Sequence, residues 1–334
     1  MSARRHPLAE RVAAWVNRLP FGRRRIVVAV SGGPDSMALL DVLSSLKLPG
    51  LVAAHVDHRL RGRQSAADRR LVERQCRRLG VPLEVRRLGD DEVRRLRQGA
   101  LEVEARHLRY AFFEQTRRAH RCHRVATAHH RDDQVETFFL HLFRGAGQTG
   151  LGGMAPIDRR RPLFRPFLDT GRDEILAYLA DRGVPFREDV SNRDLAHLRN
   201  RVRWKLLPGI RRQFGEAAIA AVARAMELLR ADDEALEELG SRHSSWSLRP
   251  GAAKARGPLA LRLAELAALP LALRRRVVRR ALEELGGPEF ELTLARVEAV
   301  LELAERSTSG KRLGFGGVAI LREREALVLR RAPR

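Results

Sequence analysis

The sequence predicts an α/β protein, with a doubly wound parallel sheet in residues 1–214 and a smaller, mainly helical domain with short C-terminal strands in residues 215–334. Two observations predict the sheet. Strand patterns alternate with helix patterns through the first two thirds of the chain, and the strand patterns are almost continuously apolar. After about residue 214 the period becomes helical, which predicts the second domain.

The first domain is predicted to contain four strands with helices between them. Apolar runs predict strands at residues 26–30, 51–57, 82–88 and 124–130. Patterns of helical period predict helices at residues 36–46, 66–79, 101–119 and 132–143. Strands separated by helices of this length pair in parallel, with helices on both faces of the sheet.

The second domain is predicted from three amphipathic stretches, at residues 216–240, 258–286 and 293–306. The tail after residue 311 has the alternation and the glycine turn of two short strands. We therefore expect a helical domain that ends in a small β element.

The charge of the chain points to a polyanionic partner. Lys and Arg number 64 against 41 Asp and Glu, which gives a formal net charge of +23. A composition bias explains why most of the basic residues are Arg, but it does not explain the excess of positive over negative charge. Nucleic acid is the commonest partner of so basic a chain.

Composition also narrows the class of protein. No apolar run reaches the roughly 18 residues of a membrane span, and the N-terminus lacks the apolar core of a secretory signal. The two cysteines, Cys76 and Cys122, form no C-x-x-C pair, which argues against a zinc ribbon, an iron–sulfur cluster or a disulfide framework. We expect a reduced cytoplasmic protein without membrane contact. The oligomeric state stays open, with a homodimer as one alternative.

The segment S-G-G-P-D-S lies between the first strand and the following helix. Glycines let a backbone approach a phosphate, and a helix N-terminus offers free amides and partial positive charge. The loop has no lysine of the kind that grips a γ-phosphate, and Asp35 instead suggests a Mg²⁺ ion beside phosphates. The alternative is a plain turn of a Rossmann-like fold. The candidate nucleotide-binding residues of the loop are Ser31, Gly32, Gly33, Pro34, Asp35 and Ser36.

A second group of polar residues follows the fourth predicted strand. His129 ends that strand, and Asp133 and Glu136 are three residues apart on the next helix, so they share one face. Strand ends and helix starts meet at one edge of a parallel sheet, so these side chains and Asp35 are expected around one ligand. The alternative is that the carboxylates satisfy a helix N-terminus and that His129 is a buried strand-end imidazole.

These motifs resemble those of a known family. The segment S-G-G-P-D-S resembles the pyrophosphate loop of the N-type ATP pyrophosphatase (PP-loop) family. The longer pattern resembles the tRNA(Ile)-lysidine synthetases within it, and the matching segments cover most of residues 21–215. They are H-V-D-H-R-L-R at 55–61, L-E-V-E-A-R-H-L-R-Y at 101–110, A-H-H-R-D-D-Q-V-E-T at 128–137, and D-V-S-N followed by R-N-R-V-R in 187–208.

The resemblance implies an activity and its reactants. The family uses ATP and Mg²⁺ to join free lysine to C2 of the wobble cytidine in tRNA(Ile) with a CAU anticodon. The cytidine O2 first attacks the α-phosphate and releases pyrophosphate. The lysine amine then attacks C2 and releases AMP.

The resemblance also implies roles for individual residues. Asp35 would hold Mg²⁺, with Asp133 as an alternative second ligand, and Asp133 or Glu136 would bind the lysine ammonium. Arg109 and His129 would stabilise charge at the α-phosphate or the adenylated base. The adenine edge is expected at Ala54, His55 and Val56. The residues expected to bind tRNA phosphates are Arg199, Asn200, Arg201, Arg203 and Lys205.

Two rival functions remain open at this point. One is another PP-loop tRNA-modifying enzyme such as a thiolase, although such enzymes need cysteines beyond the two present. The other is a tRNA-binding protein with a vestigial nucleotide loop, although each acidic position that the chemistry needs is occupied. A glutamine-dependent synthetase would need a further domain, for which no residues remain.

Overall fold

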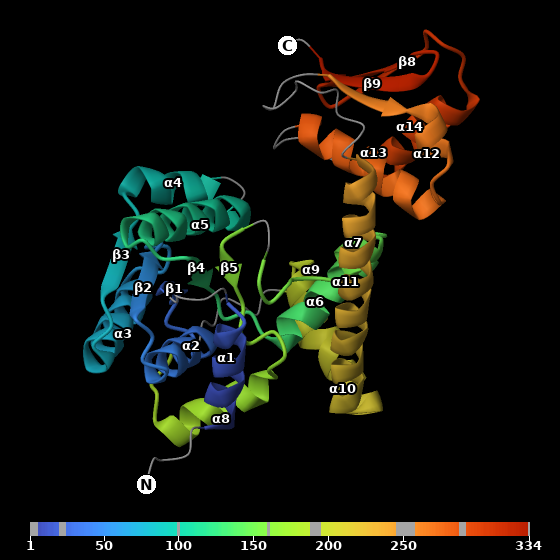
Figure 1. Ribbon diagram of the computed structural model, residues 1–334. Coiled ribbons are helices and arrows are strands. Elements are labelled where there is room, and N and C mark those ends of the chain that lie inside the picture. Colours follow the sequence, from blue (N-terminus) through green and yellow to red (C-terminus); the bar gives the residue numbers. More distant parts are fainter. Residues whose placement is uncertain are drawn as a thin grey trace. The chain divides into compact units, whose positions relative to one another are not determined.

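The structure is a computed structural model in which the chain folds into two compact units, Met1–Arg230 and Ala231–Arg334 (Figure 1). The division lies inside the long helix α11, Glu216–Ser244, and the expected boundary after residue 214 lies just before this helix. The assignment of a catalytic and a tRNA-binding part stays a prediction. The structure describes residues 6–19, 25–98, 101–158, 161–187, 195–244, 258–286 and 292–332.

Five parallel strands form the sheet of the first unit, in the order β3-β2-β1-β4-β5. They are β1 Arg25–Ala29, β2 Gly50–Asp57, β3 Leu83–Arg87, β4 Arg124–Ala126 and β5 Leu163–Phe164. From β1 the chain first moves outward through β2 and β3 and then returns to β4 on the other side. The change of direction creates a crevice at the carboxyl ends of β1 and β4, where open α/β sheets bind their ligands.

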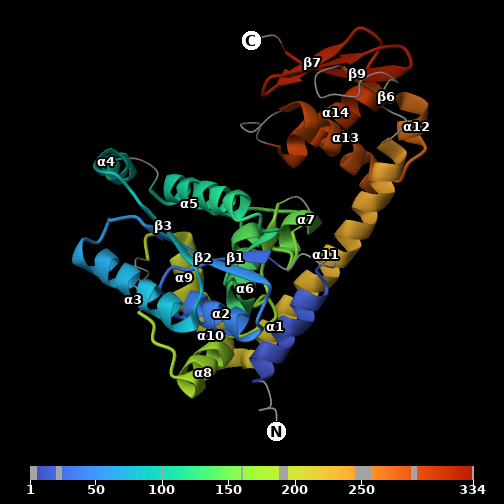
Figure 2. The same cartoon turned by 60° about the vertical axis from the view of Figure 1, so that its left-hand side comes forward.

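Helices cover both faces of this sheet, which confirms the doubly wound prediction (Figure 2). One face carries α1 Pro7–Asn17, α2 Pro34–Ser45, α3 Arg63–Leu79 and α8 Arg172–Arg182. The other face carries α5 Leu101–Ala119, and α4 Asp90–Gln98 lies beside α5. Burial on both faces explains why the central strands are apolar at successive positions.

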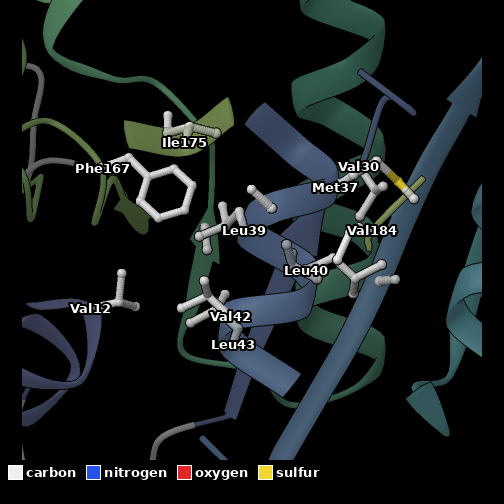
Figure 3. Packing of buried hydrophobic residues seen from close by; sticks show 14 of the residues in the cluster. Val12, Val30, Met37, Leu39, Leu40, Val42, Leu43, Phe167, Ile175 and Val184 are labelled. Atoms are coloured by element: carbon white, nitrogen blue, oxygen red, sulfur yellow. The ribbon is translucent and has the colours of Figure 1, made fainter. Parts of the chain in front are cut away.

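Helix α2 is the centre of the larger core (Figure 3). Leu39 and Leu43 are fully buried, and so are Met37 and Leu40. Figure 3 shows its side chains reaching toward Phe167 on one side and toward Val30 and Val184 on the other. A helix enclosed in this way is apolar around most of its circumference, and its N-terminus is consequently held firmly at the end of β1.

Two strands differ from the sequence prediction. The fourth strand ends at Ala126 rather than at residue 130, because the following residues turn toward the N-terminus of α6, Arg131–Leu142. The fifth strand, Leu163–Phe164, was not predicted. Two residues are too few to show an alternating pattern, and the strand forms by pairing with β4.

A helical run beside α6 completes the site-bearing part of the first unit. It consists of α9 Leu198–Arg201, the π-helical turn η2 Val202–Leu206 and α10 Leu207–Phe214. Val202 and Leu207 are buried against Val135 of α6 and Ile219 of α11. These four side chains fix the run against α6 at Val135, between Asp133 and Glu136. The D-V-S-N motif lies in residues 188–194, outside the described residues.

The second unit has an antiparallel sheet in the order β6-β9-β8-β7. Its elements after α11 are β6 Leu259–Arg262, α12 Leu263–Ala267, α13 Leu271–Gly286, α14 Leu294–Arg306, β7 Arg312–Phe315, β8 Val318–Arg322 and β9 Ala326–Arg331. The expectation of helices with short strands is confirmed, but the tail after residue 311 forms three strands rather than the two expected. The stretch 258–286 was predicted to be helical throughout, but it begins with strand β6. This strand forms by pairing with the distant β9, and no local sequence pattern shows that pairing. Within the described ranges, no helix is long and apolar enough to cross a membrane.

We expect Tyr178→Phe to lower the free energy of unfolding by about 1.5–3 kcal/mol, the usual contribution of a hydrogen bond to a charged group. The Tyr178 hydroxyl donates to the buried Asp41 at 2.7 Å, and Arg78 and Arg182 lie 3.6 and 3.5 Å from that carboxylate. Urea unfolding checks the change. Since Tyr178 lines neither cavity described below, a change in catalytic constants would contradict this purely structural role.

Candidate active site

The loop after β1 is shaped by its own hydroxyl groups. The Ser31 amide donates to Ser36 Oγ at 3.0 Å, and Ser36 Oγ donates to the Gly33 carbonyl at 3.0 Å. Helix α2 begins at Pro34, so the first-turn amides, including that of Asp35, have no partner within the helix. The loop therefore presents a helix N-terminus to the crevice, as its phosphate-binding interpretation requires.

The backbone conformation at position 32 requires a glycine. Its φ is +94°, a region that favours glycine, and an added Cβ would lie 3.5 Å from Asp68. The Gly32 carbonyl accepts from the Arg187 amide at 3.0 Å, and Asp68 binds the guanidiniums of Arg61 and Arg187 at 2.8 and 2.7 Å. The loop is thus braced by a carboxylate that holds two cations next to the expected phosphates.

One cavity, of about 610 Å³, opens beside the loop at the ends of β1 and β2. Its lining includes His55 and Val56 of β2, and Arg109 and Tyr110 of α5. His55 Nδ1 lies 2.8 Å from the Val30 carbonyl, which ties the two strand ends together. Ala54, also expected near the adenine, is fully buried and does not line the cavity. The adenine assignment of this cavity stays a prediction.

A second cavity, of about 680 Å³, lies on the other side of the loop. Six Arg and four carboxylate side chains line it, so it is basic overall, and its lining includes an aromatic side chain. Its lining outside the loop includes Arg172, Arg187, Arg203, Arg211, His130, Asp132, Glu136, Trp204, Leu207 and Pro208. The two cavities share a boundary that consists of Ser31, Gly33, Asp35, Arg61, Asp68 and Arg109. Asp35 and Arg109 therefore face both spaces, as residues at a reacting phosphate would.

His130 joins the acidic side chains of the site. Its Nε2 lies 3.7 Å from Asp35 Oδ2 and 3.5 Å from Asp133 Oδ2, and its Nδ1 lies 3.7 Å from Asp132 Oδ2. The imidazole is only 3% exposed. The structure thus brings Asp35 and Asp133 to the same ring nitrogen of a histidine that is not among the sequence-predicted site residues, and Asp132 to the other nitrogen. The sequence feature that could have indicated His130 is its position directly after His129 and directly before the first residue of α6.

The carboxylates of Asp133 and Glu136 are already engaged. Arg203 reaches Glu136 Oε1 at 2.5 Å and Asp133 Oδ1 at 2.9 Å, and Arg199 reaches Glu136 Oε2 at 2.9 Å and Asp133 Oδ1 at 3.2 Å. Asp133 Oδ2 also accepts from the His130 amide at 3.1 Å. Two carboxylates and two guanidiniums therefore form one charge-compensated cluster, which we call the α6 charge cluster.

Neighbouring positive charges explain the low pKa of Asp133. Burial alone would raise the pKa of Asp133, but the imidazoles of His130 and His129 and the guanidiniums of Arg199 and Arg203 hold it below its usual range. Asp35 behaves differently. Burial raises the pKa of Asp35, and the neighbouring His130 offsets this only in part. A cation in the crevice would therefore favour the charged form of Asp35.

His129, expected near the α-phosphate, lines the first cavity. Its Nδ1 lies 2.9 Å from the Thr127 hydroxyl. Burial lowers the pKa of His129 to about 4, so the ring is neutral at pH 7. It can donate or accept a hydrogen bond there, and its expected role in stabilising charge at the α-phosphate or the adenylated base stays a prediction.

Asp132 anchors the start of α6 to two other segments. It accepts a hydrogen bond from the Arg172 amide at 3.1 Å and binds the Arg211 guanidinium. Burial alone would raise the pKa of Asp132, but the bonds from Arg211 and from the Arg172 amide lower it. Gln134 adds a second anchor, because its side-chain amide exchanges two hydrogen bonds with the Met154 backbone at 2.7 and 2.8 Å.

The five residues expected to bind tRNA fall into two groups. Arg199 and Arg203 belong to the α6 charge cluster, and Arg203 lines the second cavity. Arg201 and Lys205 are exposed on the same helical run, and Asn200 is half-buried. A phosphate-binding role for these five residues stays a prediction. Arg199 and Arg203 would have to break their ion pairs with Asp133 and Glu136 before they could bind a phosphate.

The oxygen chemistry of the site suits a Mg²⁺ ion at Asp35. Asp35 Oδ1 is buried and has no hydrogen-bond partner, whereas both oxygens of Asp133 have partners. Among the described residues, no group of three or more His, Cys, Asp or Glu side chains is arranged as a metal site. A bound ion would therefore depend on Asp35 together with phosphate oxygens. The assignment of Asp133 as a second ligand stays a prediction.

We expect the free energy of unfolding to fall as the pH drops from about 6.5 toward 4, partly because of His58. Burial, with the charge of Arg109 as a second cause, lowers the pKa of His58 to about 4 from the ordinary 6.5. In this range the unfolded chain binds a proton that the folded protein does not, at a cost of up to about 1 kcal/mol per pH unit. His58→Gln should reduce the difference between urea unfolding at pH 7 and pH 5. His107→Gln, at an exposed position of α5, should leave it unchanged.

Comparison with known proteins agrees with this geometry. A family model described as a PP-loop domain matches residues 5–210, and one described as a TilS substrate binding domain matches residues 261–328. Among solved structures, the U34-tRNA thiolase NcsA from Methanococcus maripaludis aligns with a TM-score of 0.55 and 16% identity, over 67% of this chain and 78% of that one. A likeness at this identity shows a shared fold only.

Several curated relatives carry the name tRNA(Ile)-lysidine synthase. The protein from Symbiobacterium thermophilum is 39% identical over 90% of this chain and 64% of its own length, and that from Geobacter sulfurreducens is 40% identical over 86% and 61%. The chain thus spans somewhat less than two thirds of these relatives. The protein from Chlorobaculum tepidum is 36% identical over 83% of both chains. The chain therefore belongs to the PP-loop family and, within it, to the tRNA(Ile)-lysidine synthase family.

Proposed function

We propose that the protein uses ATP to join free lysine to C2 of the wobble cytidine in tRNA(Ile) with a CAU anticodon. The observation that carries this proposal is the pair of cavities that meet at Asp35 and Arg109. Adenylation of a base needs one space for ATP, another for the base and its later nucleophile, and a common wall where the α-phosphate reacts. The basic lining of the second cavity suits a polyanionic substrate.

In the first step, the cytidine O2 attacks the α-phosphorus of ATP, and pyrophosphate leaves. The N-terminus of α2 and the cations Arg61 and Arg187 are placed to bind the leaving pyrophosphate. Arg109 lines both cavities and is placed to stabilise charge that develops on the α-phosphate. Asp35 would hold Mg²⁺, which offsets charge on the leaving group.

In the second step, the lysine amine attacks C2 of the adenylated cytidine, and AMP leaves. Lysine has an ordinary pKa of about 10.4, so its ammonium must lose a proton before it attacks. The α6 charge cluster contains two carboxylates, and one of them, Glu136, lines the second cavity. For Asp133 or Glu136 to receive the ammonium, Arg199 or Arg203 must move aside. Exchange of one cation for another keeps the cluster neutral.

The rival function of a thiolase is disfavoured by the cysteines. The chain contains only Cys76 and Cys122, and both are buried. Burial raises the pKa of the Cys76 thiol to about 11, so it is not a thiolate at pH 7. A vestigial binding protein is disfavoured by Asp35, since a buried carboxylate oxygen without a partner is costly unless a ligand uses it.

The test is transfer of labelled lysine to RNA. The purified chain is incubated with Mg²⁺, ATP, labelled lysine and an unmodified tRNA(Ile) transcript that bears CAU, beside a transcript that bears GAU. The proposal predicts label in the first transcript only. Pyrophosphate release that depends on tRNA, but without lysine transfer, would keep the adenylation chemistry and reject lysine as the nucleophile. Tight tRNA binding without either signal would support the binding-protein alternative.

A further inference from the structure

Trp204 is an exposed aromatic residue in the wall of a basic cavity. It is 41% exposed and lines the second cavity, together with the apolar side chains of Leu207 and Pro208. Aromatic residues make up only 5% of the chain, and only three are Trp. A solvent-accessible indole in a cavity wall offers an aromatic face on which a planar ligand can stack.

The neighbouring residues hold Trp204 in place. Arg203, directly before it, is bound to Glu136 and Asp133, and Val202 and Leu207 are 2% and 1% exposed within the core under the helical run. The turn that carries Trp204 is π-helical, and such turns occur often at functional sites. The indole is therefore presented to the cavity by a backbone that is anchored on both sides.

The side chains around Trp204 indicate which class of ligand binds there. Guanidiniums of Arg172, Arg187 and Arg211 line the same cavity, where Arg187 is also paired with Asp68 and Arg211 with Asp132. An aromatic face next to several guanidiniums is the arrangement that binds single-stranded nucleic acid, because the ring stacks on an unpaired base and the cations bind its phosphates. A free amino acid or pyrophosphate has no planar face to cover an indole.

We infer that Trp204 stacks on the reacting cytosine and positions it in the second cavity, an inference that rests on the proposed function. We assign the stacked base to the reacting cytosine, rather than to a neighbouring base, because of the wall that the two cavities share. Trp204 and Asp35 line the same cavity, and the base that reaches this space is the one whose O2 can meet the α-phosphate. Trp204 thus acts as a positioning residue for the first step.

The direct test uses Trp204 as a fluorescent reporter. Trp15→Phe and Trp246→Phe in the full chain leave Trp204 as the only Trp. The probes are an anticodon stem-loop RNA bearing CAU, the same RNA without the wobble base, and the same RNA without the next loop base. We expect the first and third RNAs to quench the emission and the second to bind without quenching. Equal quenching by all three, or binding of the first RNA without quenching, would overturn the inference.

A kinetic test separates stacking from structure. Trp204→Ala should raise the KM for tRNA roughly 5- to 100-fold, since stacking contributes about 1–3 kcal/mol per base. The KM values for ATP and lysine should stay unchanged, and Trp204→Phe should restore most of the tRNA affinity. Phe214→Ala, which removes a more exposed aromatic residue outside both cavities, is the control without effect. A rise in all three KM values, or no rescue by Phe, would overturn the inference.

The two proposals fail in different ways. Quenching that requires the wobble base, without lysine transfer, would refute the proposed function and keep Trp204 as a base-binding residue. Lysine transfer with normal tRNA kinetics in Trp204→Ala would keep the function and refute the stacking.

Discussion

Asp35→Asn is expected to lower the rate of tRNA-dependent pyrophosphate release by roughly 100- to 1000-fold, the usual effect of removing one charge-stabilising group. The substitution keeps the size of the side chain. Among the residues that the structure describes, it removes the one carboxylate that lines both cavities and has an oxygen without a hydrogen-bond partner. The rate is measured as pyrophosphate released from Mg²⁺-ATP with saturating tRNA. The free energy of unfolding should not fall, because burial disfavours the charged form of Asp35.

The matched control for this variant is Asp173→Asn. Asp173 also lies in the first turn of a helix, α8, but it is exposed and lines neither cavity. Its replacement should leave the rate unchanged. If Asp35→Asn retained more than about a tenth of the wild-type rate, Asp35 would not hold the metal or the leaving group.

Glu136→Gln is expected to destabilise the fold by about 3–5 kcal/mol and to abolish lysine transfer. Glu136 is 1% exposed, and both of its oxygens accept from guanidiniums of the α6 charge cluster. Loss of one partner of a buried ion pair leaves a buried charge without compensation, and this accounts for most of the cost. Urea unfolding at pH 7 measures the change. The exposed pair Glu302 and Arg306 serves as control, and Glu302→Gln should have almost no effect.

A double-mutant cycle tests whether loss of the ion pair with Arg203 causes the destabilisation by Glu136→Gln. Arg203→Met should also be destabilising, but Glu136→Gln together with Arg203→Met should cost less than the sum of the two, because the double variant removes one charge of each sign. Additive effects would show that the two side chains do not depend on each other, contrary to the 2.5 Å contact between them.

Much of the fold could be predicted from the sequence, for physical reasons that differ between elements. Helix α5 was expected at residues 101–119, where the structure places Leu101–Ala119, because its periodic pattern is long. Strand β5 has two residues and depends on its pairing with β4, and β6 depends on β9 nearly seventy residues away. Such pairings are tertiary, so no local pattern contains them.

The site could be predicted in part for a similar reason. Asp35 lies in a loop whose composition already indicates phosphate binding, and the spacing of Asp133 and Glu136 places them on one face of α6. Their pairing with Arg199 and Arg203, sixty to seventy residues later, depends on how the helical run packs on α6. A basic segment in the sequence suggests phosphate contacts, and only the structure shows that two of its members neutralise the carboxylates. The neutral state of His129 likewise follows from burial, which the sequence does not show.

The most direct test of the account is whether the α-phosphate of ATP becomes attached to tRNA. The wild-type chain is incubated with Mg²⁺, α-labelled ATP and the CAU transcript, first without lysine and then with it. The account predicts label on the tRNA in the absence of lysine and its release as AMP once lysine is added. One contradicting result is labelled AMP released while the tRNA carries no label under any condition. The other is label on the tRNA that lysine does not release. Either result would contradict the claim that the base is first adenylated and then attacked by lysine.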